Sequence, residues 1–282
     1  MIDVIIPLYN ASSTLEQTLM SLDIQTMRDD INVYLIDDYS SDKYDEIIEK
    51  FDKLKINYYR LEKNVGPAQA RQKGIDISSS EYIMFLDADD YLYKIDSVQE
   101  LYDGIKGYEY VMGYSYDEKR GRYLYNEGDL HGKLYSRKFI KDKNIKFNNS
   151  RFHEDNYFNN LYVVCEPKTK KLEEGVYIYR YNKNSITNDD KTFERLEILL
   201  KNIKEFLKEA KKRNAKKELI LHLLVTKIRY LTCQYVMFNE EQRVQFEGWL
   251  EKYELPFLEY MGRLDYNNIK EELMEKYNKI IF

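Results

Sequence analysis

The chain is poor in the residues that mark several common classes of protein. Its 282 residues include only two cysteines, Cys165 and Cys233, which are far apart and show neither metal-ligand spacing nor a disulfide framework. A reducing, cytoplasmic setting is therefore the expectation. The first residues, "MIDVIIPLYN", carry no basic region or cleavage site, so no signal peptide is expected. No run of about 18 apolar residues occurs, so no membrane-spanning helix is expected either.

The chain also lacks a strong charge of one sign and the short motifs of several enzyme classes. The formal net charge of −5 provides no general attraction to nucleic acid. No G-x-G-x-x-G, Walker A or H-E-x-x-H motif and no convincing serine nucleophile elbow occurs. An apolar content of 43% and a charged content of 33% are typical of a globular protein. The length suits one large or two modest domains.

Apolar segments alternate with helical patterns over the first hundred residues. Strands are expected at 3–9, 31–38, 56–62 and 81–90, and helices at 12–22, 44–51 and 66–78. Ser13 and Glu16 have the spacing of a capping box for the first helix, and Pro67 suits the first turn of the third. This alternation predicts a parallel α/β sheet, in which ligands bind beyond the carboxyl ends of the strands.

The pattern changes after residue 106. We expect a hairpin over 108–128 that turns near Arg120–Gly121, short helices at 136–144 and 153–164, and a strand at 175–182. From about residue 190 the apolar spacing is helical, and Pro256 separates the last two helices. The sequence therefore predicts an α/β domain at 1–188 followed by a helical C-terminal domain at 189–282.

The segment "FLDADD" places three carboxylates after an apolar run. In an extended segment Asp87 and Asp89 point the same way and share one site. Carboxylate oxygens are hard ligands that suit Mg²⁺ or Mn²⁺ together with substrate phosphates. Because D-x-D is short, an acidic turn that caps the next helix is an alternative interpretation. An EF-hand does not fit, since Leu92 stands where the loop needs Gly and Val98 where it needs Glu.

Six segments together resemble the inverting GT-A glycosyltransferases of family 2. They are "VIIPLYN" (4–10), "LIDDYSSD" (35–42), "NVGPAQARQKGI" (64–75), "YIMFLDADD" (82–90), "GKLYSRKFI" (132–140) and "HEDNYF" (153–158). They keep the family's order over roughly residues 1–185, and the helical tail lies outside the resemblance. The resemblance implies a GT-A, Rossmann-like domain with a mostly parallel central sheet. It also implies transfer of a sugar from a UDP-sugar to an acceptor hydroxyl, with inversion and with Mn²⁺ or Mg²⁺.

The resemblance assigns the nucleotide base to the ends of the first two strands. Pro7 and Tyr9 would line the base pocket, with Tyr9 stacked on uracil. Asp38 would accept a hydrogen bond from the uracil N3–H, with Asp37 supporting it. A carboxylate that only accepts favours uracil over cytosine, which offers no such N–H. The alternative is that Asp37 or Asp38 caps a helix that starts near Lys43.

The same resemblance assigns the sugar and the diphosphate to the next elements. Asp87 would contact the ribose, Asp89 would hold the metal with Asp87 beside it, and Ala88 between them belongs to the donor site. Arg71 fits a contact to uracil or phosphate, although a solvated charge on a helix is an equal alternative. Lys133 is a second basic residue able to reach phosphate.

The resemblance assigns catalysis to "HEDNYF". Asp155 would be the general base that takes the proton of the acceptor hydroxyl, while Glu154 orients it or binds acceptor. Without the resemblance, two acids at a helix start are favourable partners of the helix dipole. His131 is a metal or acceptor contact or, like His153, a histidine at the surface or packed in the fold.

Two other functions stay open at this point. One is a UDP-sugar-binding or scaffold protein without catalysis, against which the intact D-A-D and Glu–Asp segments argue. The other is a sugar nucleotidyltransferase, which would need a glycine-rich entry loop where the chain has "PLYNASS". A cell-surface polysaccharide or teichoic acid precursor is the commonest acceptor in the family, and glycoprotein, lipid carrier or modified DNA base stay open.

The helical tail carries an excess of positive charge. Between Lys191 and Thr232 there are 12 Lys or Arg and 5 Asp or Glu residues. The basic segment "KEAKKRNAKK" (208–217) is a candidate for docking an anionic acceptor or the inner face of the membrane. The alternatives are a solvated face of a helical bundle or a contact between copies in a homo-oligomer.

Overall fold

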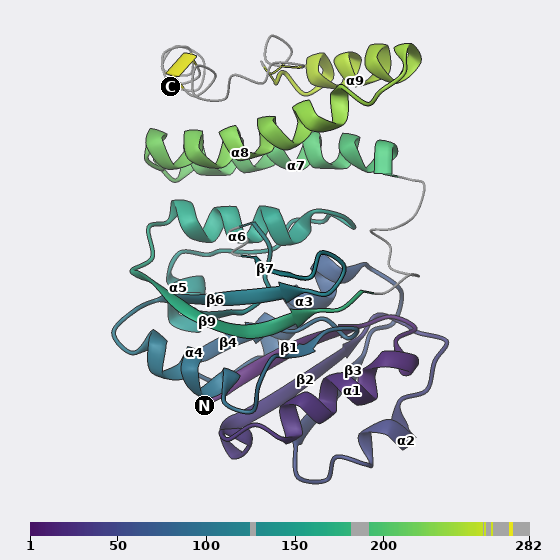
Figure 1. Cartoon of the computed structure of the whole chain (residues 1–282), viewed down its shortest axis with the longest axis vertical. Helices are drawn as coiled ribbons and strands as arrows, with labels where there is room; N and C mark the ends of the chain where they lie inside the picture. The colour runs from purple at the N-terminus through teal and green to yellow at the C-terminus, as the bar shows by residue number, and fades with distance from the viewer. Residues whose placement is uncertain (125–127, 182–191, 256, 258–260, 262–270, 273–282) are drawn as a thin grey trace. The chain divides into compact units, whose positions relative to one another are not determined.

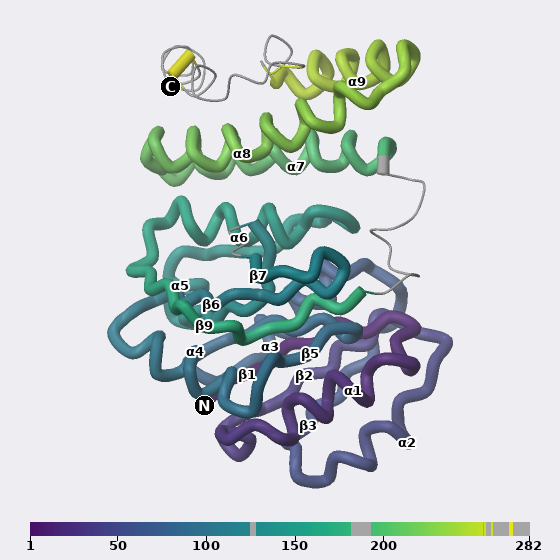
Figure 2. Tube along the Cα trace, viewed as in Figure 1, coloured from purple at the N-terminus to yellow at the C-terminus, as the bar shows by residue number. Residues whose placement is uncertain are grey.

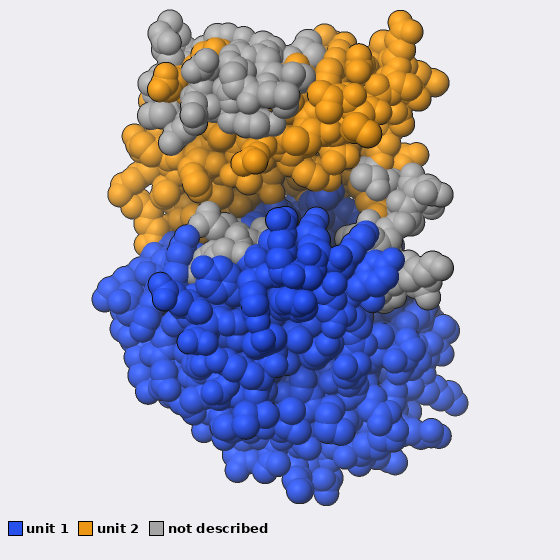
Figure 3. All heavy atoms as spheres, viewed as in Figure 1, with its two compact units in different colours: residues 1–159, 167–185 blue, residues 160–166, 186–282 orange. Residues whose placement is uncertain are grey.

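The computed structural model describes residues 1–124, 128–181, 192–255, 257, 261 and 271–272 (Figure 1). The chain forms two compact units, one of residues 1–159 and 167–185 and the other of residues 160–166 and 186–282 (Figure 3). The domain boundary expected near residue 188 and the break expected at Pro256 lie outside the described residues. The division of the chain into domains at 188 stays a prediction.

The first unit is built on one mixed sheet. In the described residues its strands are β1 (Ile2–Leu8), β2 (Ile31–Asp37), β3 (Lys55–Arg60), β4 (Tyr82–Phe85), β5 (Tyr91–Leu92), β6 (Tyr110–Asp117), β7 (Arg122–Leu124), β8 (Lys133–Ser136) and β9 (Thr169–Tyr179). Their order is β3-β2-β1-β4-β8-β6-β9-β5, with β7 paired to β6. The first four strands in this order run parallel, as the alternation predicts. β8 runs antiparallel to both β4 and β6.

Helices cover both faces of this sheet (Figure 1). They are α1 (Ser12–Asp23), α2 (Asp45–Ile48), α3 (Pro67–Ile77), α4 (Ser97–Ile105), α5 (Arg137–Asp142) and α6 (Glu154–Val164). Leu19 of α1 and Leu101 of α4 join one core cluster with Val4 of β1. α3 packs on the opposite face, where Gly74 lies against Ile5, because neighbouring strand residues point to opposite sides.

Two local predictions are wrong. The strand expected to reach Asp90 ends at Phe85, and the chain then turns, with the Asp90 N–H donating to the Asp87 carbonyl oxygen (3.1 Å). The turn places the carboxylates of Asp87 and Asp90 within reach of donors from other segments, among them Arg71 and Tyr177. The capping box is also absent, since α1 begins after Ala11 without a side-chain cap. The hydroxyl of Tyr44 and the carboxylate of Asp42 instead accept from the N–H groups of Ala11 and Ser12.

Other helices and strands are of the type expected from the sequence but differ from the expectation in length. The helix expected at 44–51 is reduced to α2, and the strand expected at 175–182 is the end of the longer β9. The hairpin of β6 and β7 turns where expected, with the Gly121 N–H donating to the Asp117 carbonyl oxygen.

The second unit is helical, as predicted. Its long helices are α7 (Thr192–Lys212), α8 (Lys217–Tyr235) and α9 (Glu240–Lys252), which follow one another along the trace in Figure 2. Asn239 and Gln242 form a capping box at the start of α9. Among the described residues, no helix is long and apolar enough to cross a membrane.

The contact between α3 and β1 gives a test of the packing that positions the site. A Cβ atom at Gly74 would lie 2.4 Å from Cγ2 of Ile5. We expect Gly74→Ala to lower the free energy of unfolding by about 1–3 kcal/mol through overpacking. This exceeds the gain in helix propensity of about 1 kcal/mol. Urea unfolding followed by far-UV circular dichroism measures it.

Gly248 in α9 is the matched control. A Cβ atom there meets nothing within 4 Å, so Gly248→Ala should stabilise by about 0.5–1 kcal/mol. The fluorescence of Trp249, the one tryptophan of the chain, follows this change. An equal stabilisation by both substitutions would contradict the tight contact at Gly74.

Candidate active site

Two exposed tyrosines mark the ends of the central parallel strands. Tyr9 follows β1 and Tyr39 follows β2, with 56% and 53% of their surface exposed. The backbone is left-handed at Asn10 and at Tyr39 (φ 49° and 63°), which few residues other than glycine adopt. Pro7 lies in β1 just before this turn. These positions suit the predicted base pocket, and the stacking of Tyr9 on uracil stays a prediction.

Asp37 is fully buried and fully engaged with its own fold. Its Oδ2 accepts from the Tyr58 hydroxyl (2.7 Å) and from Nη1 of Arg60 (2.6 Å), and its Oδ1 accepts from the Ser40 N–H (2.8 Å). Although burial opposes it, these hydrogen bonds hold the pKa of Asp37 below its usual value. This carboxylate therefore fixes the turn after β2, in keeping with a supporting role.

Asp38 joins the end of β2 to the start of α3. Its two oxygens accept from the N–H groups of Val65 (2.7 Å) and Gly66 (2.8 Å). Gly66 has φ 91°, a conformation that glycine adopts without strain. The alternative that an aspartate caps the helix near Lys43 is wrong, because α2 has no side-chain cap. The uracil contact of Asp38 stays a prediction.

Arg71 connects two segments that are far apart in the sequence. Its Nη2 donates to Oδ1 of Asp87 (2.6 Å) and its Nη1 donates to Oε1 of Glu154 (2.7 Å). Arg71 is 6% exposed, so the interpretation as a solvated helix charge is wrong. The two carboxylates raise the pKa of the guanidinium despite its burial. A buried cation thus holds the turn after β4 beside the start of α6.

The two acids at the start of α6 have different environments. Burial raises the pKa of Glu154 to about 7, with Asp155 adding to the effect and Arg71 opposing it. Asp155 is only partly buried, and its Oδ1 accepts from the N–H (2.7 Å) and Nδ2 (3.0 Å) of Asn156. Glu154 is therefore anchored to Arg71, while Asp155 is the acid with access to solvent. Its role as the base stays a prediction.

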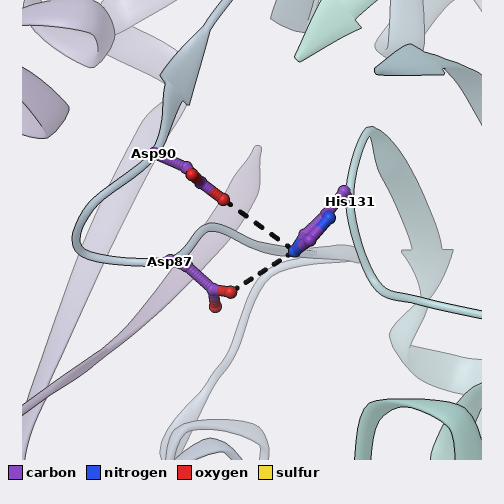
Figure 4. A group of neighbouring side chains, drawn as sticks. All are labelled: Asp87, Asp90 and His131. Carbon is purple, nitrogen blue, oxygen red and sulfur yellow. Dashed lines mark hydrogen bonds and ion pairs between the residues drawn. The ribbon is translucent and has the colours of Figure 1, made fainter. Parts of the chain in front are cut away.

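A histidine joins the aspartates of the turn (Figure 4). Nε2 of His131 lies 3.3 Å from Oδ2 of Asp87 and 3.9 Å from Oδ2 of Asp90. On the other side of the ring, Nδ1 lies 3.4 Å from Oδ2 of Asp129. Although burial opposes it, Asp129 and Asp87 raise the pKa of His131 well above its usual value. His131, left open by the sequence between a ligand and a packed residue, is part of this acidic group.

Aromatic rings fix the position of this histidine. Tyr177 and Tyr179 of β9 stack on the imidazole, with ring centroids 4.8 Å and 5.2 Å away. The hydroxyl of Tyr177 donates to Oδ2 of Asp90 (2.7 Å). Both tyrosines point to the same side of β9 because they are two residues apart.

Asp90 was not identified as a site residue from the sequence. It is 1% exposed, and its Oδ1 accepts from the Arg180 N–H (2.9 Å). Burial, together with the charges of Asp87 and Asp89, raises the pKa of Asp90 to about 8. The signal available was the third carboxylate of "FLDADD", which a turn brings next to Asp87 because residues i and i+3 of a turn approach each other.

The residues of this group fit a divalent cation. One ligand atom each from Asp87, Asp90 and His131 lies within 4.8 Å of the others. Carboxylate oxygen and imidazole nitrogen are both ligands of Mn²⁺ and related ions. Asp89 lies next to them in the turn. The strand alternation that led to Asp87 and Asp89 does not apply to a turn, so this pair of ligands stays a prediction.

Lys133 and Ala88 occupy positions within the fold around this group. Lys133 is 1% exposed, and its Nζ donates to the carbonyl oxygen and to Oδ1 of Asp129. The carbonyl oxygen of Ala88 accepts from the Thr18 hydroxyl (3.0 Å). His153 has φ 58° in the turn before α6. The phosphate contact of Lys133 and the donor contact of Ala88 stay predictions.

The basic segment 208–217 is partly neutralised by local pairs. Lys212 pairs with Glu209, and Lys216 pairs with Glu166. Nη1 of Arg213 donates to Sγ of Cys165 (3.8 Å). Docking of an anionic acceptor or a membrane face on this segment stays a prediction, as does a homo-oligomer.

The buried position of Arg71 predicts a large effect on stability. Arg71→Met leaves the buried Glu154 without its cation and the partly buried Asp87 with His131 alone, which should cost about 3–5 kcal/mol. Lys50 pairs with Glu16 at a site where both side chains are about half exposed, 53% and 50%, and serves as control. Lys50→Met should cost less than about 1 kcal/mol. Chemical unfolding of both variants measures the difference, and similar values would refute the central role of Arg71.

Comparison with known proteins places this geometry in a family. Residues 3–160, more than half of the chain, match the model of glycosyl transferase family 2. The chain is similar to the glycosyltransferase GlyA of Streptococcus pneumoniae serotype 4 (27% identity over 222 residues, 66% of this chain and 31% of GlyA). It is also similar to the minor teichoic acid biosynthesis protein GgaA of Bacillus subtilis (28% over 223 residues, 68% of this chain and 50% of GgaA). The chain thus spans half or less of the length of these relatives.

Among solved structures, the fold is similar to that of S. aureus TarS 1–349 in complex with UDP-GlcNAc. The TM-score is 0.75 at 18% identity, and the match covers 99% of this chain and 91% of TarS 1–349. The α/β unit with the mixed sheet is therefore a GT-A fold, followed by a helical C-terminal region, as the sequence predicts. The likeness of the fold and the match over residues 3–160 agree, and the chain belongs to glycosyl transferase family 2.

Proposed function

We propose that this protein transfers a sugar from a UDP-sugar to an acceptor hydroxyl, with inversion at the anomeric carbon. The observation that carries the proposal is the bridge by Arg71 between Asp87 and Glu154. It ties the turn assigned to the donor to the acidic pair assigned to the acceptor. A binding protein without catalysis would have no need of this second acidic pair beside the first.

The donor side of the proposal is a uridine nucleotide. Tyr9, just after β1, offers an exposed ring for stacking. Asp38, just after β2, donates its N–H to the carbonyl oxygen of Leu8, the residue before Tyr9. TarS, whose fold is similar, has a structure with UDP-GlcNAc. Asp37 keeps the turn between these strand ends in place through Tyr58 and Arg60.

The proposal includes a divalent cation, Mn²⁺ or Mg²⁺. Asp87 and Asp89 would hold it, with Asp90 and His131 completing the acidic group around the turn. When bound, such an ion neutralises charge on the departing diphosphate. A related fold, that of the mannosyltransferase PcManGT from Pyrobaculum calidifontis, was solved with GDP-Man and Mn²⁺ (TM-score 0.59, 14% identity).

In the transfer reaction the two acids of α6 have different roles. As the acceptor oxygen bonds to the anomeric carbon, the bond from that carbon to the diphosphate oxygen breaks and UDP leaves. Asp155 takes the proton of the acceptor hydroxyl. Glu154 stays on Arg71 and fixes the start of α6, so that Asp155 faces the acceptor. Direct displacement from the opposite side inverts the configuration at the anomeric carbon.

The acceptor class is proposed from relatives. GgaA is named for minor teichoic acid biosynthesis. The poly(ribitol-phosphate) β-N-acetylglucosaminyltransferase TarP of Staphylococcus aureus is 35% identical over 106 residues, 36% of this chain and 32% of TarP. A hydroxyl on a polyol-phosphate polymer or its precursor is therefore the first acceptor to test. UDP release from UDP-glucose, UDP-galactose and UDP-N-acetylhexosamines with this acceptor tests the function, and the absence of release with every donor would refute it.

Metal and nucleotide should bind together. We expect UDP with Mn²⁺ to raise the melting temperature more than UDP alone, because the cation offsets repulsion between the diphosphate and Asp89. Asp89→Ala should remove this additional increase. Asp76→Ala is the control, since Asp76 lies on the exposed side of α3 with Gln72 as partner. Transfer that persists unchanged in EDTA would contradict the metal.

Asp155→Asn separates catalysis from donor binding. The amide keeps the size of the side chain and cannot take a proton, so transfer should fall by about 10²–10⁴-fold. The affinity for UDP should stay near that of the wild type, because the base pocket lies at other strand ends. Single-turnover rates and calorimetric UDP titration measure the two effects. Equal loss of UDP binding would place Asp155 in the donor site, and a product with retained configuration would refute inversion.

A further inference from the structure

Arg180 has two buried nitrogen atoms that no described residue satisfies. Its Nε and Nη2 are buried and have no hydrogen-bond partner within the described part of the chain. Buried donors without partners are rare in folded proteins, since each costs roughly 1–3 kcal/mol. Arg137 shows the usual outcome, because its Nε, Nη1 and Nη2 donate to three backbone carbonyl oxygens.

The two atoms form one edge of the guanidinium group. Nε–H and Nη2–H point in parallel and match two oxygens of a single phosphate or carboxylate. The nitrogen left over, Nη1, is not needed for such a contact. The pattern of unsatisfied atoms in Arg180 is therefore that of a bidentate anion site.

The surroundings of Arg180 hold this edge beside the turn after β4. The guanidinium carbon lies 5.0 Å from the ring centroid of Tyr91, whose hydroxyl donates to Oε1 of Glu118 (2.6 Å). The backbone N–H of Arg180 donates to Oδ1 of Asp90 (2.9 Å). A ring that is itself anchored thus supports the cation.

The backbone of Arg180 lies against the turn 87–90, where its N–H donates to Asp90. Tyr91 of β5 pairs with Ile178 of β9 in antiparallel register. Arg180 follows the end of β9, and the turn 87–90 precedes β5, so the pairing of these two strands brings the two segments together. Arg180 comes one residue after Tyr179, whose ring stacks on the histidine. The guanidinium of Arg180 is thus attached to a backbone that contacts this turn, while its side chain lies over Tyr91.

We propose that Arg180 binds a phosphate group of the substrates through its Nε–Nη2 edge. The proposal rests on the proposed function, which supplies two such groups: the diphosphate of the donor and the phosphodiester of a polyol-phosphate acceptor. The two atoms of the edge are buried although the residue as a whole is only partly buried, so the proposal requires the side chain to rotate over Tyr91 to meet the ligand. Phosphate then satisfies both donors and adds a charge pair.

The test uses the full chain and distinguishes the contribution of the bidentate Nε–Nη2 edge from that of the positive charge. Arg180→Lys keeps the charge and removes the bidentate edge, while Arg180→Gln removes both. Arg243→Lys is the matched control, because Arg243 also lies over a tyrosine ring, that of Tyr235 at 5.4 Å, in the helical unit. Calorimetry with UDP and with uridine in the presence of Mn²⁺, KM values for donor and polymer, and melting temperatures are measured for each protein.

Two outcomes support the assignment and identify the source of the phosphate. If Arg180→Lys lowers the affinity for UDP by about 10–100-fold and leaves the affinity for uridine unchanged, the phosphate bound by Arg180 is that of the donor. If UDP binding is unchanged and the KM for the polyol-phosphate polymer rises by a similar factor, with the KM for donor constant, the phosphate is that of the acceptor. Arg243→Lys should change none of these values.

Three outcomes overturn it. Unchanged UDP affinity together with unchanged polymer KM would exclude a phosphate contact. A lower melting temperature with unchanged binding would make Arg180 a structural residue. An equal loss of UDP and uridine binding would point to a general disturbance of the base pocket. Tyr91→Leu, which removes the supporting ring, gives an independent check, because it should weaken the same phosphate ligand and leave uridine unchanged.

The role of Arg180 can be refuted while the proposed function still holds. A wild-type protein that binds UDP and transfers sugar, with an Arg180→Lys variant equal to it, refutes only the role of Arg180. A wild-type protein that binds neither UDP nor the polymer refutes the proposed function and the role of Arg180 with it.

Discussion

The site depends on one buried cation between two carboxylates. Arg71 lies on α3, and α3 is seated on the sheet by the close contact of Gly74 with Ile5. From there its two terminal nitrogens reach Asp87 and Glu154. In the part of the chain that the structure describes, Arg71 is the cation that pairs with the buried Glu154, and Asp87 shares it while also contacting His131. A buried carboxylate without such a partner would be neutralised or expelled. The relative position of the turn after β4 and the start of α6 is thus set by electrostatics as much as by packing.

The acidic turn shows how a fold accommodates like charges at close range. Asp87 is paired with Arg71 and His131, while Asp90 is buried and bound by the Tyr177 hydroxyl and a backbone N–H. Asp87 keeps a low pKa through Arg71, although burial opposes it, and burial raises that of Asp90. The pKa values of these neighbouring carboxylates are therefore shifted in opposite directions, because Arg71 reaches Asp87 and the interior surrounds Asp90.

Local sequence predicted the parallel strands β1 to β4 and the long helices well, since a period of two or of 3.6 is a local property. It failed where long-range partners decide. The capping box expected at Ser13 does not form, because Tyr44 and Asp42 from another segment accept the hydrogen bonds of the backbone N–H groups at the start of α1. The strand expected to reach Asp90 ended at Phe85, and the turn that follows carries acids whose donors, Arg71 and Tyr177, lie in distant segments.

The sequence by itself determined the fold class, the family and the placement of acids at the ends of strands, because these follow from short patterns in a fixed order. Only the tertiary structure decided which acids meet. Asp90 and His131 are 41 residues apart in number, and no periodicity relates them. The turn after β4 and the stacking of Tyr177 and Tyr179 on the imidazole bring them together. In the same way, Arg180 gains its position beside Asp90 from the pairing of β9 with β5, a contact between segments almost ninety residues apart.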